Sequence, residues 1–79
     1  MNRMAINVIT FGSLTDIMKE SVQLENVTDT NSLIEELNCR YPRLQQAKFI
    51  VSVNKKMIDS NTTLGSNDTV ALMPPFSGG

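Results

Sequence analysis

The residues best suited to chemistry are the last six of the printed sequence, Pro74-Pro75-Phe76-Ser77-Gly78-Gly79. They directly follow an apolar stretch at residues 69–73 that predicts a strand. A proline ring fixes φ and removes a backbone donor, so the Pro-Pro pair should leave the sheet stiff and extended. From Pro74 the chain reaches at most roughly 20 Å. Gly78 and Gly79 carry no side chains and suit a channel too narrow for other residues.

A C-terminal carboxylate presented in this way predicts activation of the carboxyl carbon, followed by its attack by sulfur. The carboxylate is a poor electrophile, but adenylation gives it a good leaving group, which a sulfur nucleophile displaces to leave a thiocarboxylate. Glycine hinders the acyl carbon least, so Gly79 is the predicted reacting residue. Pro74, Pro75, Ser77 and Gly78 would insert with it, and Phe76 would anchor in a partner's pocket. The alternatives are a frayed end without function and, for Phe76, cover by its own domain.

The remaining composition contains little that would make the chain an enzyme by itself. It has 79 residues, no histidine and one cysteine, Cys39. The usual general base and the commonest metal ligand are therefore missing, and so are an internal disulfide and a cysteine-rich zinc site. We therefore expect no bound metal or cofactor. The chain is predicted to be a protein on which other enzymes act, and whether it counts as an enzyme itself stays open. A lone thiol fits a reducing cytoplasm.

Charge and hydropathy exclude two further classes of partner. Seven basic and eight acidic residues are spread along the chain, so it lacks the dense basic surface that nucleic acid requires. No apolar run is long enough to span a membrane, and polar residues interrupt the N-terminal stretch where a signal peptide would be apolar. We therefore expect no nucleic-acid or membrane partner and no export.

Hydrophobic periodicity predicts one amphipathic helix and four or five strands. The helix is expected to be capped by Thr30 or Ser32 and to end near Tyr41, because Pro42 follows. Strands are expected at residues 4–11, 21–27, 49–53, 57–58 and 69–73, with a short helical turn at 13–16. A polar loop at 59–68 offers only Leu64 to the core. These elements predict an α+β domain, residues 1–73, with the helix packed on one face of a mixed sheet, and a flexible tail, residues 74–79.

A helix on one face leaves apolar residues on the other. If Met4, Ile6, Val8, Val70 and Leu72 face the helix, strand alternation places four residues on the opposite face: Ile9, Phe11, Ala71 and Met73. An apolar patch beside the tail would be a docking surface for partners. The alternative is a few partly covered apolar residues of the kind most proteins show.

The ending Asp68-Thr69-Val70-Ala71-Leu72-Met73-Pro74-Pro75-Phe76-Ser77-Gly78-Gly79 resembles that of the molybdopterin synthase small subunits, the MoaD-like sulfur carriers. Thr10-Phe11-Gly12-Ser13-Leu14 and Val53-Asn54 match more weakly. The order of elements is similar throughout, but only the last twelve residues are specific. The chain departs from the family at Ser66-Asn67-Asp68-Thr69, where a more acidic turn is usual, and at Met73, where an aromatic is common.

The resemblance implies a ubiquitin-like β-grasp fold and a set of partners. An ATP-dependent enzyme related to ubiquitin-activating enzymes would adenylate Gly79, and a sulfurtransferase or cysteine desulfurase would supply sulfur. The tail that carries the thiocarboxylate would enter the synthase large subunit, where two sulfur transfers convert cyclic pyranopterin monophosphate into molybdopterin. The resemblance also implies a heterotetramer of two small and two large subunits, with the catalytic side chains on the large one.

Three other functions remain open from the sequence. A ThiS-like carrier would use the same chemistry for thiazole or cysteine synthesis, although such carriers generally lack the proline pair. A ubiquitin-like modifier would form isopeptide bonds with lysines of target proteins. A simple binding module would tolerate the loss of Gly79.

Overall fold

The computed structural model describes residues 5–75, and its two central strands come from opposite ends of that range. β1 (Ala5–Thr10) and β5 (Thr69–Met73) run parallel, with Val8 opposite Val70 and Thr10 opposite Leu72. β2 (Val22–Glu25) pairs antiparallel with β1, and β3 (Ile50–Val53) pairs antiparallel with β5. The edge strand β4 (Lys56–Ile58) completes the order β2-β1-β5-β3-β4. The predicted mixed sheet is confirmed.

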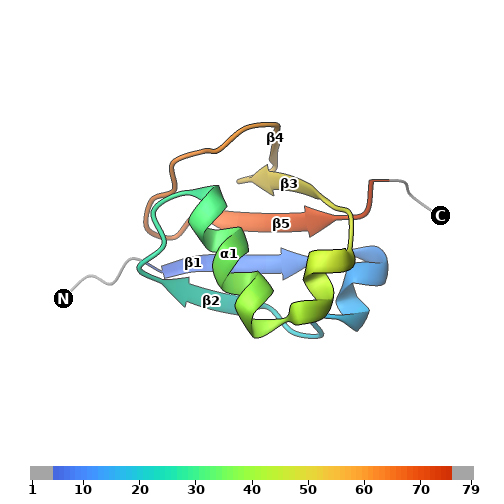
Figure 1. Ribbon diagram of the computed structural model, residues 1–79. Helices are drawn as coiled ribbons and strands as arrows, with labels where there is room; N and C mark the ends of the chain where they lie inside the picture. Colours follow the sequence, from blue (N-terminus) through green and yellow to red (C-terminus); the bar gives the residue numbers. More distant parts are fainter. Residues whose placement is uncertain (1–4, 76–79) are drawn as a thin grey trace.

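One main helix crosses one face of this sheet. α1 (Thr30–Arg40) lies diagonally over the strands (Figure 1) and is followed by the 3-10 helix η2 (Pro42–Gln46). A second 3-10 helix, η1 (Gly12–Asp16), joins β1 to β2 at the end of the sheet where β5 also ends (Figure 1). The predicted helical turn and the stop before Pro42 are confirmed, whereas η2 was not predicted. It adds Leu44 to the core, with that residue only 1% exposed.

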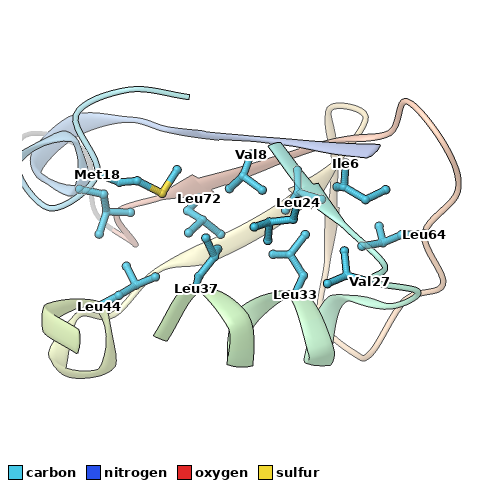
Figure 2. Packing of buried hydrophobic residues seen from close by; sticks show 12 residues of the cluster. Ile6, Val8, Met18, Leu24, Val27, Leu33, Leu37, Leu44, Leu64 and Leu72 are labelled. Atoms are coloured by element: carbon cyan, nitrogen blue, oxygen red, sulfur yellow. The ribbon is translucent and has the colours of Figure 1, made fainter. Parts of the chain in front are cut away.

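The core fills the space between α1 and the sheet. Leu33 and Leu37 point from the helix toward Leu24, Val8 and Leu72 of the strands (Figure 2). Leu64 closes one end of the core as predicted, and Val27 lies beside it, after β2 has already ended at Glu25 (Figure 2). Val70, Ala71 and Leu72 are all buried. β5 lies between β1 and β3, and its central residues are shielded from solvent on both faces of the sheet.

The cap of α1 is Asp29, not the predicted Thr30 or Ser32. An Asp29 carboxylate oxygen accepts hydrogen bonds from the Ser32 backbone N–H at 2.9 Å and from the Ser32 hydroxyl. Thr30 is buried, and its hydroxyl accepts a hydrogen bond from the Thr62 N–H at 2.9 Å. The Asn61 amide donates to the other Asp29 oxygen at 3.2 Å. These hydrogen bonds connect the start of α1 to the long loop before β5.

Stability should depend on the charge of Asp29. The Ser32 hydroxyl, followed by the Ser32 N–H and the Asn61 amide, holds the pKa of this carboxyl below its usual value. Because the folded-state pKa is lowered, the stabilisation is complete above the unfolded-state pKa of about 3.9. It is lost as the pH falls through the lowered value.

Asp29→Asn removes this titration but keeps an acceptor at the helix start. We expect the stability of the wild type relative to Asp29→Asn, measured by urea unfolding, to be greatest at neutral pH and to decline below about pH 4. All other carboxyl groups are the same in both proteins, so the comparison isolates Asp29. A stability difference that stays constant between pH 7 and pH 3 would contradict this assignment.

Candidate functional site

The face of the sheet opposite α1 carries an open groove. One row of it crosses four strands in register: Ile9 lies opposite Ala71, Ala71 opposite Ser52, and Ser52 opposite Met57. Successive side chains of a strand alternate between the two faces of the sheet, so these four side chains lie on the face opposite the core. The groove has a volume of about 590 Å³ and is lined by Ile9, Phe11, Ser52, Asn54, Lys55, Met57, Thr69, Ala71 and Met73.

All four residues predicted for the docking patch line this sheet groove. Phe11 is 48% exposed, Ile9 and Met73 are half-buried, and Ala71 is buried in the middle of the central strand. No helix among residues 5–75 covers this face. The structure thus brings the predicted residues together on a face accessible to a partner, and their docking role remains a prediction.

The β3–β4 hairpin also contributes to the groove, and the sequence patterns did not predict this contribution. Met57 is 67% exposed and lines the groove from the edge strand β4, which β5 and β3 separate from β1. The hairpin turn consists of Asn54 and Lys55, which have φ of 50° and 73°, as a two-residue turn of the primed type requires. The alternation of Val51, Ser52 and Val53 was the available signal, because it turns Ser52 away from the core. Met57 joins it only through the hairpin register.

A polar network closes one end of the groove. The Asn54 side chain accepts from the Thr69 N–H at 3.0 Å and donates to an Asp68 carboxylate oxygen at 2.9 Å. The other Asp68 oxygen accepts from the Gly65 N–H at 2.7 Å. The Gly65 N–H, followed by the Asn54 amide, lowers the pKa of Asp68. Of the described lining residues, Lys55 alone carries a charge. The groove is therefore apolar with one cation on its rim.

The other end of the groove is where the chain leaves the sheet toward the tail. Beyond Thr10, the Phe11 N–H still donates to the Leu72 carbonyl at 3.0 Å. Pro74 is half-buried and lies against Gly12, while Pro75 is exposed. The predicted tail residues Phe76, Ser77, Gly78 and Gly79 lie outside the described range. The two prolines that precede them thus start next to Phe11 and Met73.

Neither a cluster of metal-ligating side chains nor a membrane-spanning helix occurs among the described residues. No cluster of three His, Cys, Asp or Glu side chains occurs between residues 5 and 75. Over the same stretch, no helix has the length and apolar character to cross a membrane. Cys39 is free and exposed on α1, turned away from the apolar stripe as expected.

Comparison with known proteins identifies the family. The family model described as "ThiS family" matches residues 8–79, which is most of the chain and includes both the groove strands and the tail. The chain belongs to the ThiS family. Its similarity to the molybdopterin synthase sulfur carrier subunit of Mycobacterium tuberculosis is 32% identity over 80 aligned positions, covering 94% of this chain and 96% of that protein.

Solved structures share the fold of this chain. A complex of subunits 1 and 2 of the molybdopterin-converting factor from Helicobacter pylori contains a chain with a TM-score of 0.74 and 26% identity. The match covers 96% of this chain and 100% of that one. The small archaeal modifier protein 1 from Methanosarcina acetivorans has a TM-score of 0.81 at 18% identity, with both chains fully covered. These likenesses confirm the predicted ubiquitin-like β-grasp fold.

Proposed function

We propose that the chain is the sulfur carrier subunit of a molybdopterin synthase and that its reacting group is the Gly79 carboxylate. The observation that carries the proposal is the 32% identity with a carrier of that name over 94% of the chain. The ending Pro-Pro-Phe-Ser-Gly-Gly, placed directly after the central strand β5, supports it. The carrier would bind no cofactor of its own, and its single free cysteine suits work in the cytoplasm.

The first step would be adenylation by a separate enzyme related to ubiquitin-activating enzymes. A Gly79 carboxylate oxygen attacks the α-phosphorus of ATP and forms an acyl adenylate, and pyrophosphate leaves. The mixed anhydride makes the acyl carbon electrophilic, and AMP becomes its leaving group. The carrier contributes an unhindered acyl group because glycine has no side chain beside that carbon. The binding of ATP and its catalytic groups belong to the activating enzyme.

The second step would replace AMP by sulfur from a sulfurtransferase or cysteine desulfurase. If sulfur arrives as a protein persulfide, its terminal sulfur attacks the acyl carbon and AMP departs. A thiol then reduces the acyl disulfide, which leaves the thiocarboxylate on Gly79 and a disulfide on the donor side. One oxygen of the original carboxylate leaves with AMP, so the net change in the carrier is the replacement of one oxygen by sulfur.

The third step would take place in the synthase large subunit. The thiocarboxylate sulfur attacks a carbon of the pterin precursor and displaces the oxygen substituent of that carbon, which takes up a proton as it leaves. Water then hydrolyses the resulting thioester, which restores the Gly79 carboxylate and leaves the sulfur on the pterin. Two such transfers give the two sulfurs of molybdopterin. The large subunit would supply the catalytic side chains and the pterin site, in a heterotetramer with two carriers.

The sheet groove would dock the carrier onto these partners. It lies beside the exit of the tail, so a partner bound in the groove would receive the tail at the same time. Lys55 on the rim would suit a carboxylate of the partner next to an apolar side chain seated between Phe11 and Met57. An apolar centre with a charged rim is the usual anatomy of a protein interface.

Charge introduced into the groove should disrupt docking selectively. Phe11→Asp and Met73→Asp would bury an unpaired carboxylate in the interface. Each should weaken binding of the large subunit at least tenfold, an estimate of about 1.4 kcal/mol or more. Neither should unfold the domain, because both side chains are at least partly exposed in the carrier alone. Isothermal titration calorimetry with the large subunit gives the affinities.

Gln46→Asp is the matched control. Gln46 is exposed on η2, next to α1 and away from the groove, so this variant should bind like the wild type. Equal binding by Phe11→Asp and Gln46→Asp would show that the groove does not dock the large subunit.

The proposed function itself is tested by reconstitution. Carrier bearing a terminal thiocarboxylate is incubated with the synthase large subunit and cyclic pyranopterin monophosphate, and the dithiolene product is measured. Product formed only with the thiocarboxylate form supports the proposal. If the thiocarboxylate forms but the pterin is not converted, the chain is a sulfur carrier for another product. Isopeptide conjugates in cells would instead indicate a protein modifier.

A further inference from the structure

Gly12 makes an unusually close approach to the first residue of the tail. A Cβ placed on Gly12 would lie 2.7 Å from Pro74 Cγ and 3.3 Å from Pro74 Cδ. Protein carbon atoms rest about 3.5 to 4.0 Å apart, so the proline ring occupies the space that any other residue at position 12 would need. By comparison, a Cβ on Gly65 would lie no nearer than 3.9 Å to another atom. The contact joins the β1–η1 turn to the start of the tail.

The backbone conformation alone does not explain glycine at this position. Gly12 has a φ of 60°, in the left-handed region that glycine adopts freely. The same chain holds Asn26, Asn54 and Asn67 at φ of 68°, 50° and 69°. Asparagine tolerates this region because its short polar side chain can bond locally. What distinguishes position 12 is the Pro74 ring on top of it.

The Gly12 side of the contact is fixed, whereas the Pro74 side has fewer restraints. The Gly12 carbonyl accepts a hydrogen bond from the Thr15 hydroxyl at 2.7 Å, and Leu14 is buried in the core. Phe11 on the other side is bonded to Leu72. Pro74 follows the last paired residue of β5, Met73, and has no N–H to bond to the sheet. Any added bulk at position 12 should therefore displace Pro74, not the turn.

We propose that Gly12 is a positioning residue whose bare backbone seats the Pro74 ring and thereby sets the direction in which the tail leaves the domain. The inference rests on the proposed function, since it concerns where the Gly79 carboxylate is delivered. Gly79 is five residues beyond Pro74, so the tail spans at most about 17 Å. A tilt of about 15° at Pro74 would move the far end of such a span by about 4 Å, enough to misplace a reacting group.

The test compares Gly12→Asn in the wild-type and in the Pro74→Ala background. Asparagine permits the positive φ but adds a Cβ, and Pro74→Ala removes the ring atoms that this Cβ would meet. The activating enzyme, ATP and a sulfur donor are supplied, and kcat and KM for thiocarboxylate formation are measured by intact mass. With Pro74 present, Gly12→Asn should lower kcat about tenfold or more. KM should stay within about twofold, because the docking groove is unchanged.

In the Pro74→Ala background, adding Gly12→Asn should lower kcat by less than about twofold, since the contact is already lost. Pro74→Ala alone should lower kcat more than Pro75→Ala, which also removes a proline ring but from an exposed residue. If Gly12→Asn does not fold in either background, the comparison of Pro74→Ala with Pro75→Ala becomes the decisive one. Folding of Gly12→Asn only together with Pro74→Ala would support the proposed contact.

The outcomes separate the inference from the proposed function. Equal losses from Gly12→Asn in both backgrounds, unchanged kcat with Pro74 present, or equal losses from Pro74→Ala and Pro75→Ala would each overturn the positioning role. A wild-type chain that gains no sulfur would refute the proposed function, and the inference would fall with it. A wild type that gains sulfur, together with an equally fast Gly12→Asn, would overturn the inference alone.

Discussion

Deletion of Gly79 is expected to abolish thiocarboxylate formation and to leave the domain folded. The deletion shortens the reach of the tail by about 3.5 Å, so the carboxylate of Gly78 would stop short of the α-phosphorus of ATP. Since adenylation requires the attacking oxygen in near-contact geometry, we expect the rate to fall by more than about a thousandfold. The sheet groove and core would be untouched, because both are built from residues 5–73.

Two controls make the Gly79 deletion informative. A chain with one glycine added after Gly79 should fail as completely, because the register of the carboxylate is shifted the other way. The deleted chain should still bind the activating enzyme through the groove, and so inhibit the wild type competitively. Thermal unfolding should be the same for all three chains. A deleted chain that still gains sulfur would show that the reacting carboxylate is not placed by the length of the tail.

Leu37→Ala is expected to be strongly destabilising. Leu37 is fully buried and points from α1 into the centre of the core (Figure 2). Removing a buried leucine side chain costs about 2–5 kcal/mol of the free energy of unfolding, because apolar contact is lost and a cavity remains. A domain of this size has a free energy of unfolding of only about 4–12 kcal/mol. A substantial part of its stability would therefore disappear.

Cys39→Ala is the matched control for Leu37→Ala. Cys39 is two residues further along the same helix and is exposed, so its loss should change the free energy of unfolding by less than about 0.5 kcal/mol. Urea unfolding of both variants gives the comparison. The folded fraction of Leu37→Ala should also retain carrier activity, because the residue touches neither groove nor tail. Similar stabilities for the two variants would contradict the assigned core.

Local sequence patterns predicted the parts of the fold that depend on neighbouring residues. Alternation in β1 and β5 separated Ile6 and Val8 from Ile9, and Val70 and Leu72 from Ala71, so both the core face and the groove face followed from it. Pro42 marked the end of α1 because the residue before proline avoids helical geometry. Leu64 was recognisable as the one large apolar residue in a polar loop.

The parts that sequence patterns missed depend on contacts between distant segments. Thr30 and Ser32 were the predicted caps, but the cap is Asp29, whose carboxylate is held at the helix start by hydrogen bonds from Ser32 and from Asn61 of the distant loop. Met57 reached the groove only through the register of a two-residue turn. The contact between Gly12 and Pro74 spans most of the chain and follows from the parallel pairing of β1 with β5. Spacing along the sequence carries no signal for such pairs.

The carrier function is tested by the intact mass of the wild-type chain after incubation with ATP, its activating enzyme and a sulfur donor. We expect a gain equal to the replacement of one oxygen by sulfur, located on Gly79 by fragmentation and absent without ATP. A chain whose mass stays unchanged, with no AMP detected on its C-terminus at any time, would contradict the carrier function.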